Sequence, residues 1–213
     1  MKKIALLLMA AVLLGILSGC RVSVEPTTTA HKTTAPVMTT RPLITTQPTT
    51  TIGNTSTTET TRILSAVWDS YAQEERFAAY GGTVEHSVAD APGALDMAAI
   101  DELTNAYLMP VERLEEVAEA ASLVHMMNSN IFTGVVLQLK PTGQLRAFAD
   151  DWRGVIRENR WICGQPDRLL MLAVDETHLL MAFGSNEAMD TFRTKTAAIY
   201  GQSKTLYDEP IVA

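Results

Sequence analysis

The pattern of apolar positions divides the chain into three parts. Residues 4–16 form an almost unbroken apolar run, residues 21–61 show no apolar period, and residues 62–213 carry apolar side chains at helical or strand spacing. Recurrence every three or four residues predicts helices, and alternation predicts strands. The third part therefore predicts one folded domain, since roughly 150 residues is an ordinary domain size.

Helical spacing occurs in five segments of this domain, which are residues 62–80, 98–107, 111–120, 143–159 and 186–200. The fourth segment has the clearest pattern, one apolar stripe made of Leu145, Phe148, Ala149, Trp152 and Ile156. The last segment presents Met189, Phe192, Thr196 and Ile199. Pro110 suits a helix start, and Ser185 can cap the last helix. Gly81 and Gly82 are expected to end the first helix, and Gly201 the last.

Two hairpins and an edge strand are predicted from the remaining apolar segments. Residues 122–127 and 132–140 flank a turn at residues 128–130, and residues 169–174 and 178–183 flank Asp175 and Glu176. The tail, residues 206–212, can add an edge strand. Both faces of the second hairpin are apolar, so its strands should be central in the sheet or covered on both sides. Consecutive hairpins favour an α+β fold in which helices pack on one face of an antiparallel sheet.

The first twenty residues have the features of an export signal. Lys2 and Lys3 precede an apolar run of 13 residues, which is shorter than the ~18 that a membrane-spanning helix needs. Leu17-Ser18-Gly19-Cys20 matches the lipobox of bacterial lipoproteins. An ordinary secretory signal or an uncleaved helix explains fewer of these features. We therefore predict a signal peptide at residues 1–19.

The lipobox resemblance implies a diacylglyceryl group on the Cys20 sulfur, with acyl chains such as palmitate, and cleavage that leaves Cys20 first. Two acyl chains suffice for stable anchoring, so the predicted location is the extracytoplasmic face of the cell membrane. Threonine takes 17 of the 41 positions from 21 to 61, among several prolines. Such a composition predicts a disordered tether over residues 20–61 and also resembles O-glycosylated stalks.

Charge narrows the classes of partner. The chain has 24 Asp and Glu against 17 Lys and Arg, and between residues 62 and 125 there are 12 acidic residues against three arginines. This bias argues against binding to nucleic acid and against close approach to anionic lipid. The glutamates at 112, 115, 116 and 119, around Arg113, have helical spacing, which usually marks a solvated face. We expect an unknown protein or small-molecule partner.

Cys163 is the most suggestive single residue. It lies in Trp161-Ile162-Cys163-Gly164-Gln165-Pro166, a distant echo of the thioredoxin Trp-Cys-Gly-x-Cys sequence with proline replacing the second cysteine. A helix beginning just after a thiol lowers its pKa, but Cys163 follows a predicted helix and precedes a strand. With Cys20 lipidated, no internal disulfide partner remains. We expect a buried structural cysteine and keep Trp161 and Cys163 as candidate functional positions.

His125, Met126 and Met127 have side chains suited to Cu(I). On a strand only His125 and Met127 point the same way, and two ligands are too few, so we interpret the group as core. His125 remains a candidate functional position, whereas His86 and His178 show no spacing that joins them to it. No catalytic motif, metal-ligand pattern or phosphate-binding loop is present in the sequence, so we expect neither enzymatic activity, metal nor cofactor.

Three runs, at residues 122–128, 161–167 and 207–211, resemble a group of lipoproteins from gut Firmicutes. Members are often labelled "bacteriocin transport accessory protein". The resemblance implies a lipoprotein in a Gram-positive setting and adds no active site. The first hypothesis is therefore a non-catalytic binding or transport-accessory lipoprotein, and the alternative is a thiol redox accessory protein acting through Cys163. A third hypothesis is a metal-binding domain.

Overall fold

A computed structural model describes residues 57–211 of the chain. These residues form helices and an eight-stranded sheet in which every strand pair is antiparallel, so the predicted α+β class is confirmed. With η for 3₁₀ helices, the elements in chain order are α1 (Glu59–Asp69), η1 (Gln73–Glu75), β1 (Ala79–Gly81), η2 (Val84–His86), β2 (Val88–Ala89), β3 (Gly93–Ala94), α2 (Ile100–Asn105), η3 (Val111–Glu116), β4 (Val117–His125), β5 (Phe132–Leu139), α3 (Leu145–Glu158), β6 (Arg168–Ala173), β7 (His178–Gly184), α4 (Asn186–Ile199) and β8 (Lys204–Pro210).

The two predicted hairpins form the centre of the sheet. The strand order is β2-β1-β4-β5-β7-β6-β8, with β3 also paired to β4. Hairpin β4–β5 aligns Ala121 with Val136, and hairpin β6–β7 aligns Met171 with Met181. Pairing of β5 with β7 joins the hairpins, and β8 pairs with β6 at the edge. The predicted edge strand is confirmed.

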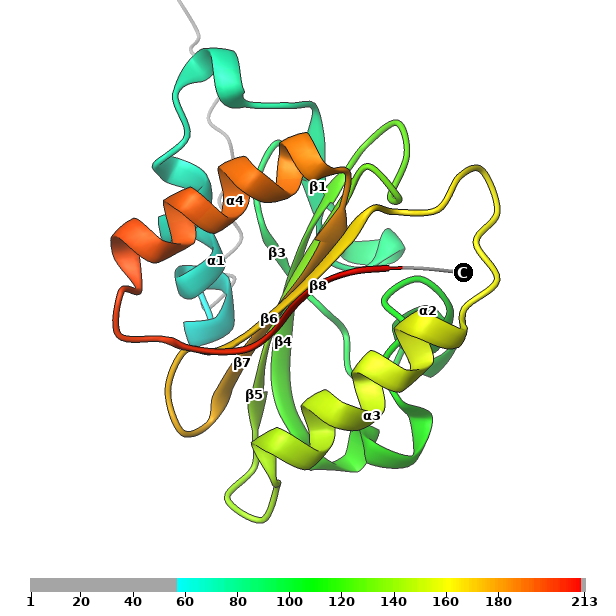
Figure 1. The fold of residues 1–213 in the computed structure, drawn as a ribbon. Helices are drawn as coiled ribbons and strands as arrows, with labels where there is room; N and C mark the ends of the chain where they lie inside the picture. The colour runs from blue at the N-terminus through cyan, green and yellow to red at the C-terminus, as the bar shows by residue number, and fades with distance from the viewer. Residues whose placement is uncertain (1–56, 212–213) are drawn as a thin grey trace, which may run out of the picture. The chain divides into compact units, whose positions relative to one another are not determined.

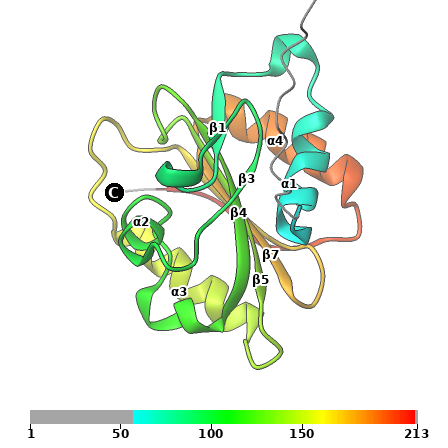
Figure 2. The same ribbon diagram turned by 180° about the vertical axis from the view of Figure 1, so that it is seen from behind.

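Helices cover both faces of the sheet, so the expectation of a single helix-bearing face is wrong. Figures 1 and 2 show α1 and α4 on one side and α2 and α3 on the other. Alternate residues of β5 enter two cores: Val135 and Leu137 pack on the α2 and α3 side, and Val136 packs on the α1 and α4 side. Strands that are apolar on both faces have two surfaces to bury, and each needs its own layer of helices.

The two longest helices match their predictions. In α3 the stripe of Phe148, Ala149, Trp152 and Ile156 is buried. Ser185 caps α4, because its hydroxyl accepts a hydrogen bond from the Ala188 amide. One position in α4 differs from the expectation, since Ile199 is 39% exposed instead of facing the core.

The first predicted helix, residues 62–80, is wrong at both ends. It begins at Glu59, because Thr58 caps it by accepting a hydrogen bond from the Thr61 amide. It ends at Asp69, where the Ser70 hydroxyl donates to the Val67 carbonyl at 2.6 Å, a local bond that competes with helix continuation. The remainder contains η1 and strand β1, which pairs with β4.

The helix predicted at residues 111–120 is also wrong beyond its first turns. The chain forms a 3₁₀ helix to Glu116 and enters β4 at Val117, five residues before the predicted strand. The cause is tertiary, because residues 117–121 pair with the central strand β5.

The predicted signal peptide, the predicted lipidation of Cys20 and the predicted tether up to residue 56 lie outside the described residues. Within residues 57–211, no helix has the length and apolarity that a membrane crossing would require.

Candidate functional site

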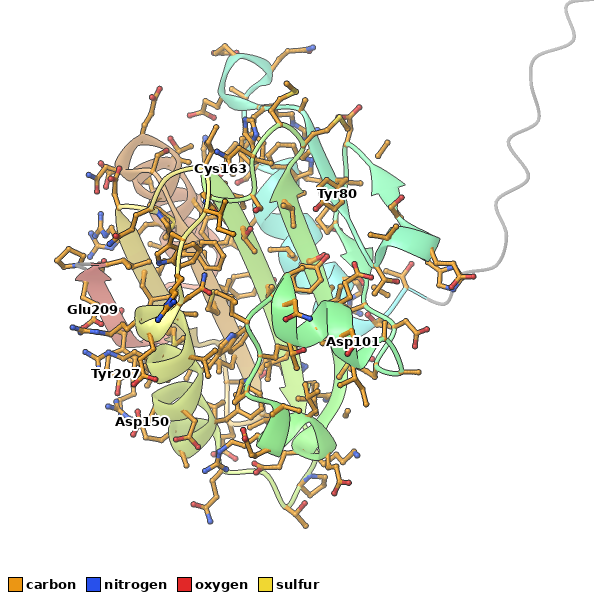
Figure 3. The ribbon with its side chains drawn as sticks, turned by 90° about the vertical axis from the view of Figure 1, so that its right-hand side faces the viewer. Tyr80, Asp101, Asp150, Cys163, Tyr207 and Glu209 are labelled. Atoms are coloured by element: carbon orange, nitrogen blue, oxygen red, sulfur yellow. The ribbon has the colours of Figure 1, made fainter. Side chains whose placement is uncertain are left out.

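Four strand ends meet at one end of the sheet, which we call the loop end. The register places Val124 beside Thr133, Phe132 beside Gly184, and Gly184 beside Arg168. The end of β4, the start of β5, the end of β7 and the start of β6 therefore lie together. The loop end carries two loops, residues 126–131 and residues 160–167 (Figure 3).

Asparagine side chains fasten these two loops to each other. The Asn130 amide donates to the carbonyls of Ile162 at 2.8 Å and Gly164 at 2.5 Å, and the Asn128 amide donates to the Cys163 carbonyl at 3.3 Å. These bonds hold Cys163 at a positive φ of 66°, a conformation that costs a non-glycine residue on the order of 1 kcal/mol. The turn at Cys163 is thus held in one conformation by hydrogen bonds from the neighbouring loop.

Cys163 is exposed, so the expectation of a buried structural cysteine is wrong. It lies in a left-handed turn between α3 and β6 and not in the strand itself. Figure 3 shows Cys163 and Tyr80 at the loop end of the domain.

The two methionines beside His125 are also not part of the core. Strand β4 ends at His125, so Met126 is 49% exposed and Met127 is 81% exposed. The His125 ring stacks on Phe77 with a centroid distance of 5.1 Å, and its Nδ1 accepts a hydrogen bond from the Met127 amide at 3.2 Å. The core interpretation fails because the strand stops one residue before the methionines.

The structure brings two of the three candidate positions together. His125 and Cys163 line one pocket of about 380 Å³, with both methionines. Trp161 is not among the residues that line it. Its half-buried ring lies edge-on to Phe183 at 5.1 Å, and its Nε1 is buried without a hydrogen-bond partner among the described residues. Trp161 therefore packs the loop onto the sheet.

A second pocket, of about 360 Å³, adjoins the first at His125 and is called the aromatic groove. It lies between η1 and the first turns of α4, and its lining includes Tyr71, Glu74, Phe77, His125, Ile131 and Glu187. Burial, followed by the charge of Glu75, raises the pKa of Tyr71. Tyr71 is thus a neutral part of the wall. This groove could not be predicted from the sequence, because residues 62–80 were expected to form a single helix.

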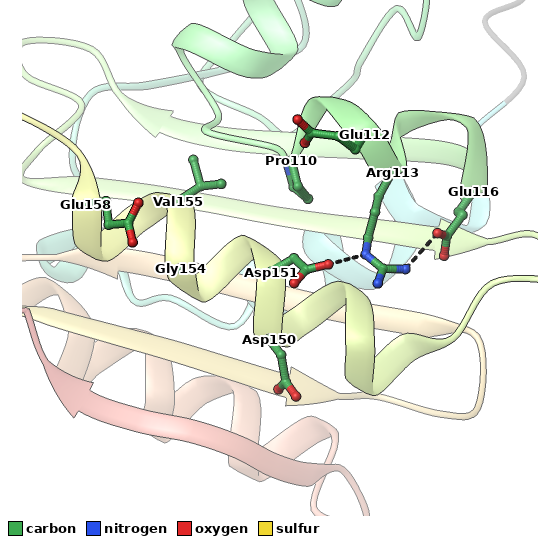
Figure 4. A pocket seen from close by; sticks show the side chains of 9 residues that line it. All are labelled: Pro110, Glu112, Arg113, Glu116, Asp150, Asp151, Gly154, Val155 and Glu158. Atoms are coloured by element: carbon green, nitrogen blue, oxygen red, sulfur yellow. Dashed lines mark hydrogen bonds and ion pairs between the residues drawn. The ribbon is translucent and has the colours of Figure 1, made fainter.

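A third pocket, about 650 Å³, lies between η3 and α3 (Figure 4), far from Cys163 in the fold (Figure 3). Five carboxylates line it, from Glu112, Glu116, Asp150, Asp151 and Glu158. Arg113 lies between two of them, donating to Asp151 and, at 2.7 Å, to Glu116 (Figure 4). The hydrogen bond to Asp151 is the main cause of the raised pKa of Arg113. We therefore interpret this pocket as an ion-paired surface. It includes Glu112 and Glu116, two of the glutamates for which the sequence predicted a solvated face.

Ion pairs attach the edge strand β8 to both layers of helices. Glu209 accepts a bidentate contact from Arg153 of α3, at 2.7 and 2.9 Å. Asp208 accepts from Arg168 at 2.6 Å and from Arg193 of α4 at 2.9 Å. Figure 3 shows Tyr207 and Glu209 beside Asp150. These charged residues stabilise the edge strand on both of its faces and lie outside the two loop-end pockets.

His178, the other histidine on a strand, is part of the core and lies outside the two pockets that His125 lines. It is buried at the far end of β7, and its Nδ1 lies 2.7 Å from the Asp175 carboxylate. Among residues 57–211 no group of three or more His, Cys, Asp or Glu side chains is arranged to hold a metal ion.

Comparison with known proteins gives no relative. No protein-family model, curated protein or solved structure matches this chain. The case for function therefore depends on the sequence features of the N-terminus and on the geometry of the loop end.

Proposed function

We propose that this chain is a lipid-anchored extracytoplasmic lipoprotein whose domain binds a partner through the loop end, as a non-catalytic binding or transport-accessory protein. The lipobox ending at Cys20 supports the anchor. The observation that carries the binding role is the exposure of large apolar side chains on the loop end, with Met127 at 81% and Ile162 at 82%.

The position of the loop end fits this role. The Thr60 amide at the start of α1 donates to the Glu119 carboxylate, so the described chain begins beside the start of β4. Glu119 and His125 are six residues apart on β4, which corresponds to about 20 Å of strand. The apolar loops therefore lie at the end of the sheet opposite the first described residues. A domain anchored through its N-terminus can present that end to a partner.

The size of the apolar surface suits recognition. Met126, Met127, Ile131 and Ile162 together expose on the order of 400 Å² of apolar side chain, in the range of functional patches on monomers. The Asn128 and Asn130 bonds hold the two loops in one arrangement, which limits the entropy lost when a partner binds.

The anchor is tested by membrane fractionation. The wild-type chain should sediment with membranes, and Cys20→Ala should appear in the soluble fraction. Mass spectrometry of the mature wild-type protein should find the diacylglyceryl mass on Cys20. An unmodified thiol at position 20 would refute the anchor.

The binding surface is tested by site-specific crosslinking in intact cells. A photoreactive amino acid at Met127 or Ile162 should give one defined adduct. The same amino acid at Val111, which is 54% exposed on η3, is the matched control and should give none. Equal adducts from all three positions, or none from the loop end, would contradict a binding role for that surface.

The alternative function is a thiol redox accessory protein. It is favoured by the exposure of Cys163 and by His125 lining the same pocket. Alkylation of the native full-length chain across pH is the test. A rate that exceeds that of a free cysteine below pH 8 and falls in His125→Gln would support the alternative, whereas the rate of an ordinary thiol in both proteins would remove it.

A further inference from the structure

We infer that the aromatic groove binds a basic peptide segment, one that places a bulky apolar side chain between Tyr71 and Phe77 and a lysine or arginine between Glu74 and Glu187. This inference rests on the proposed binding function and names the chemical class of the partner.

The apolar wall of the groove is held in place by the core beneath it. Phe77 lies 5.0 Å from the Trp68 ring and 5.3 Å from the Phe132 ring, and it stacks on His125. Tyr71 lies 5.0 Å from the same Trp68 ring. Aromatic walls that are fixed before binding offer contact area to an apolar side chain without further ordering.

The charges that face the groove are predominantly negative. Glu74 and Glu187 are exposed and form no ion pair among residues 57–211. The third carboxylate, Glu75, is paired with Lys195 at 2.6 Å, and that hydrogen bond is the main cause of its lowered pKa. The charge of Lys195 is thus already paired with that of Glu75, and the carboxylates of Glu74 and Glu187 remain for a cationic partner.

Each of these two carboxylates belongs to a helical element, which fixes the position of its backbone. Glu187 belongs to the first turn of α4, where the helix dipole favours a negative charge. Glu74 is the middle residue of η1 and lies three residues after Tyr71 in the chain. The negative charges therefore flank the apolar surface, an arrangement complementary to a segment with an apolar side chain next to a cation.

Charge also distinguishes a basic peptide from two other occupants. Residues 57–211 contain 23 Asp and Glu against 12 Lys and Arg, a formal charge of −11. A second copy of the chain would carry the same negative charge and be repelled. The exposed apolar patch of Met126, Met127, Ile131 and Ile162 is also only about half of the ~800 Å² that each partner buries in a stable interface. An anionic lipid surface would be repelled for the same reason.

The test uses a labelled heptapeptide in which lysine alternates with leucine or phenylalanine, titrated into the full-length chain and followed by fluorescence anisotropy. Binding should weaken with salt. The double variant Glu74→Gln/Glu187→Gln should weaken it about five- to tenfold, as expected for two exposed ion pairs. The matched control is Glu112→Gln/Glu158→Gln, which removes the same charge from the pocket beside α3 and should change binding less than about twofold.

Several outcomes would overturn the inference. They are equal binding of a peptide with serine replacing each lysine, equal weakening by the control variant, self-association of the chain that involves Glu187, and binding to anionic vesicles in place of the peptide. The crosslinking experiment separates this inference from the proposed function. Defined adducts at Met127 without peptide binding would refute only the basic partner, whereas blanks in both would refute the binding function as well.

Discussion

A ring of three buried hydrogen bonds joins the segment after α2, strand β4 and the residue that follows β1. The Tyr107 hydroxyl donates to the Gly82 carbonyl at 2.7 Å and accepts from the Ser122 hydroxyl at 3.1 Å, and the Ser122 hydroxyl accepts from the Gly82 amide at 3.0 Å. Burial is the main cause of the raised pKa of Tyr107, so the hydroxyl remains a donor at physiological pH. We predict that this ring is a cooperative unit of stability.

The magnitude follows from the groups left without partners. Tyr107→Phe leaves the Gly82 carbonyl without its donor, and Ser122→Ala leaves the Gly82 amide without its acceptor. An orphaned buried polar group costs about 1–3 kcal/mol, so each single variant should lose about 2 kcal/mol of unfolding free energy. Because the three bonds share atoms, the double variant should lose less than the sum of the singles, with a coupling of about 0.5–3 kcal/mol.

Urea unfolding of the full-length chain, followed by circular dichroism, measures these losses. With a slope of about 2 kcal/mol per molar urea, each single variant should lower the midpoint by about 1 M. Tyr80→Phe is the matched control, because the half-buried Tyr80 hydroxyl makes no hydrogen bond among the described residues. Single-variant shifts no larger than that of the control, or strictly additive losses, would refute the reasoning.

Two further predictions concern backbone contact and charge. A Cβ on Gly81 would lie 2.2 Å from the Gly93 amide nitrogen and 2.3 Å from the Ser122 carbonyl oxygen, so Gly81→Ala should lower the melting temperature by at least about 5 °C. The control is Gly154→Ala, in open space on α3, which should leave the melting temperature unchanged or raise it. A larger loss in Gly154→Ala than in Gly81→Ala would show that the strands around Gly81 can separate at little cost. The hydrogen bond from Arg153 is the main cause that lowers the pKa of Glu209 from its usual 4.5. The ion pair therefore stabilises the fold above about pH 4.5, and this stabilisation is lost as the pH falls through the lowered pKa of Glu209 in the folded protein. Wild type should therefore exceed Glu209→Gln by about 1–2 kcal/mol near neutral pH, and denaturant titrations should show the gap closing in acid; a gap independent of pH would contradict the ion pair.

Periodicity alone was enough to predict α3 and most of the length of the central strands. The α3 stripe and the four central strands follow from the positions of their apolar residues, because each of these elements must place those side chains against the core wherever its neighbours lie. Prediction failed where another segment competed for the backbone. Residues 117–121 read as helix by spacing, but their amides and carbonyls pair with β5, and residues 79–81 pair with β4.

The candidate site shows the same division. The sequence singled out His125 and Cys163, since few residue types offer their chemistry, but it placed the thiol and the methionines in the core. Their exposure depends on where β4 stops and on a left-handed turn at Cys163, which local spacing does not encode.

The sequence by itself determined the α+β class, the central hairpins, the best helix and the acidic charge, because each depends on residue type and order alone. Only the tertiary structure decided that two layers of helices enclose the sheet, that loops 35 residues apart share hydrogen bonds at one end, and that Phe77 and Glu187 border one groove. Those relations arise from strand pairing and packing between distant segments, which the order of neighbouring residues does not specify.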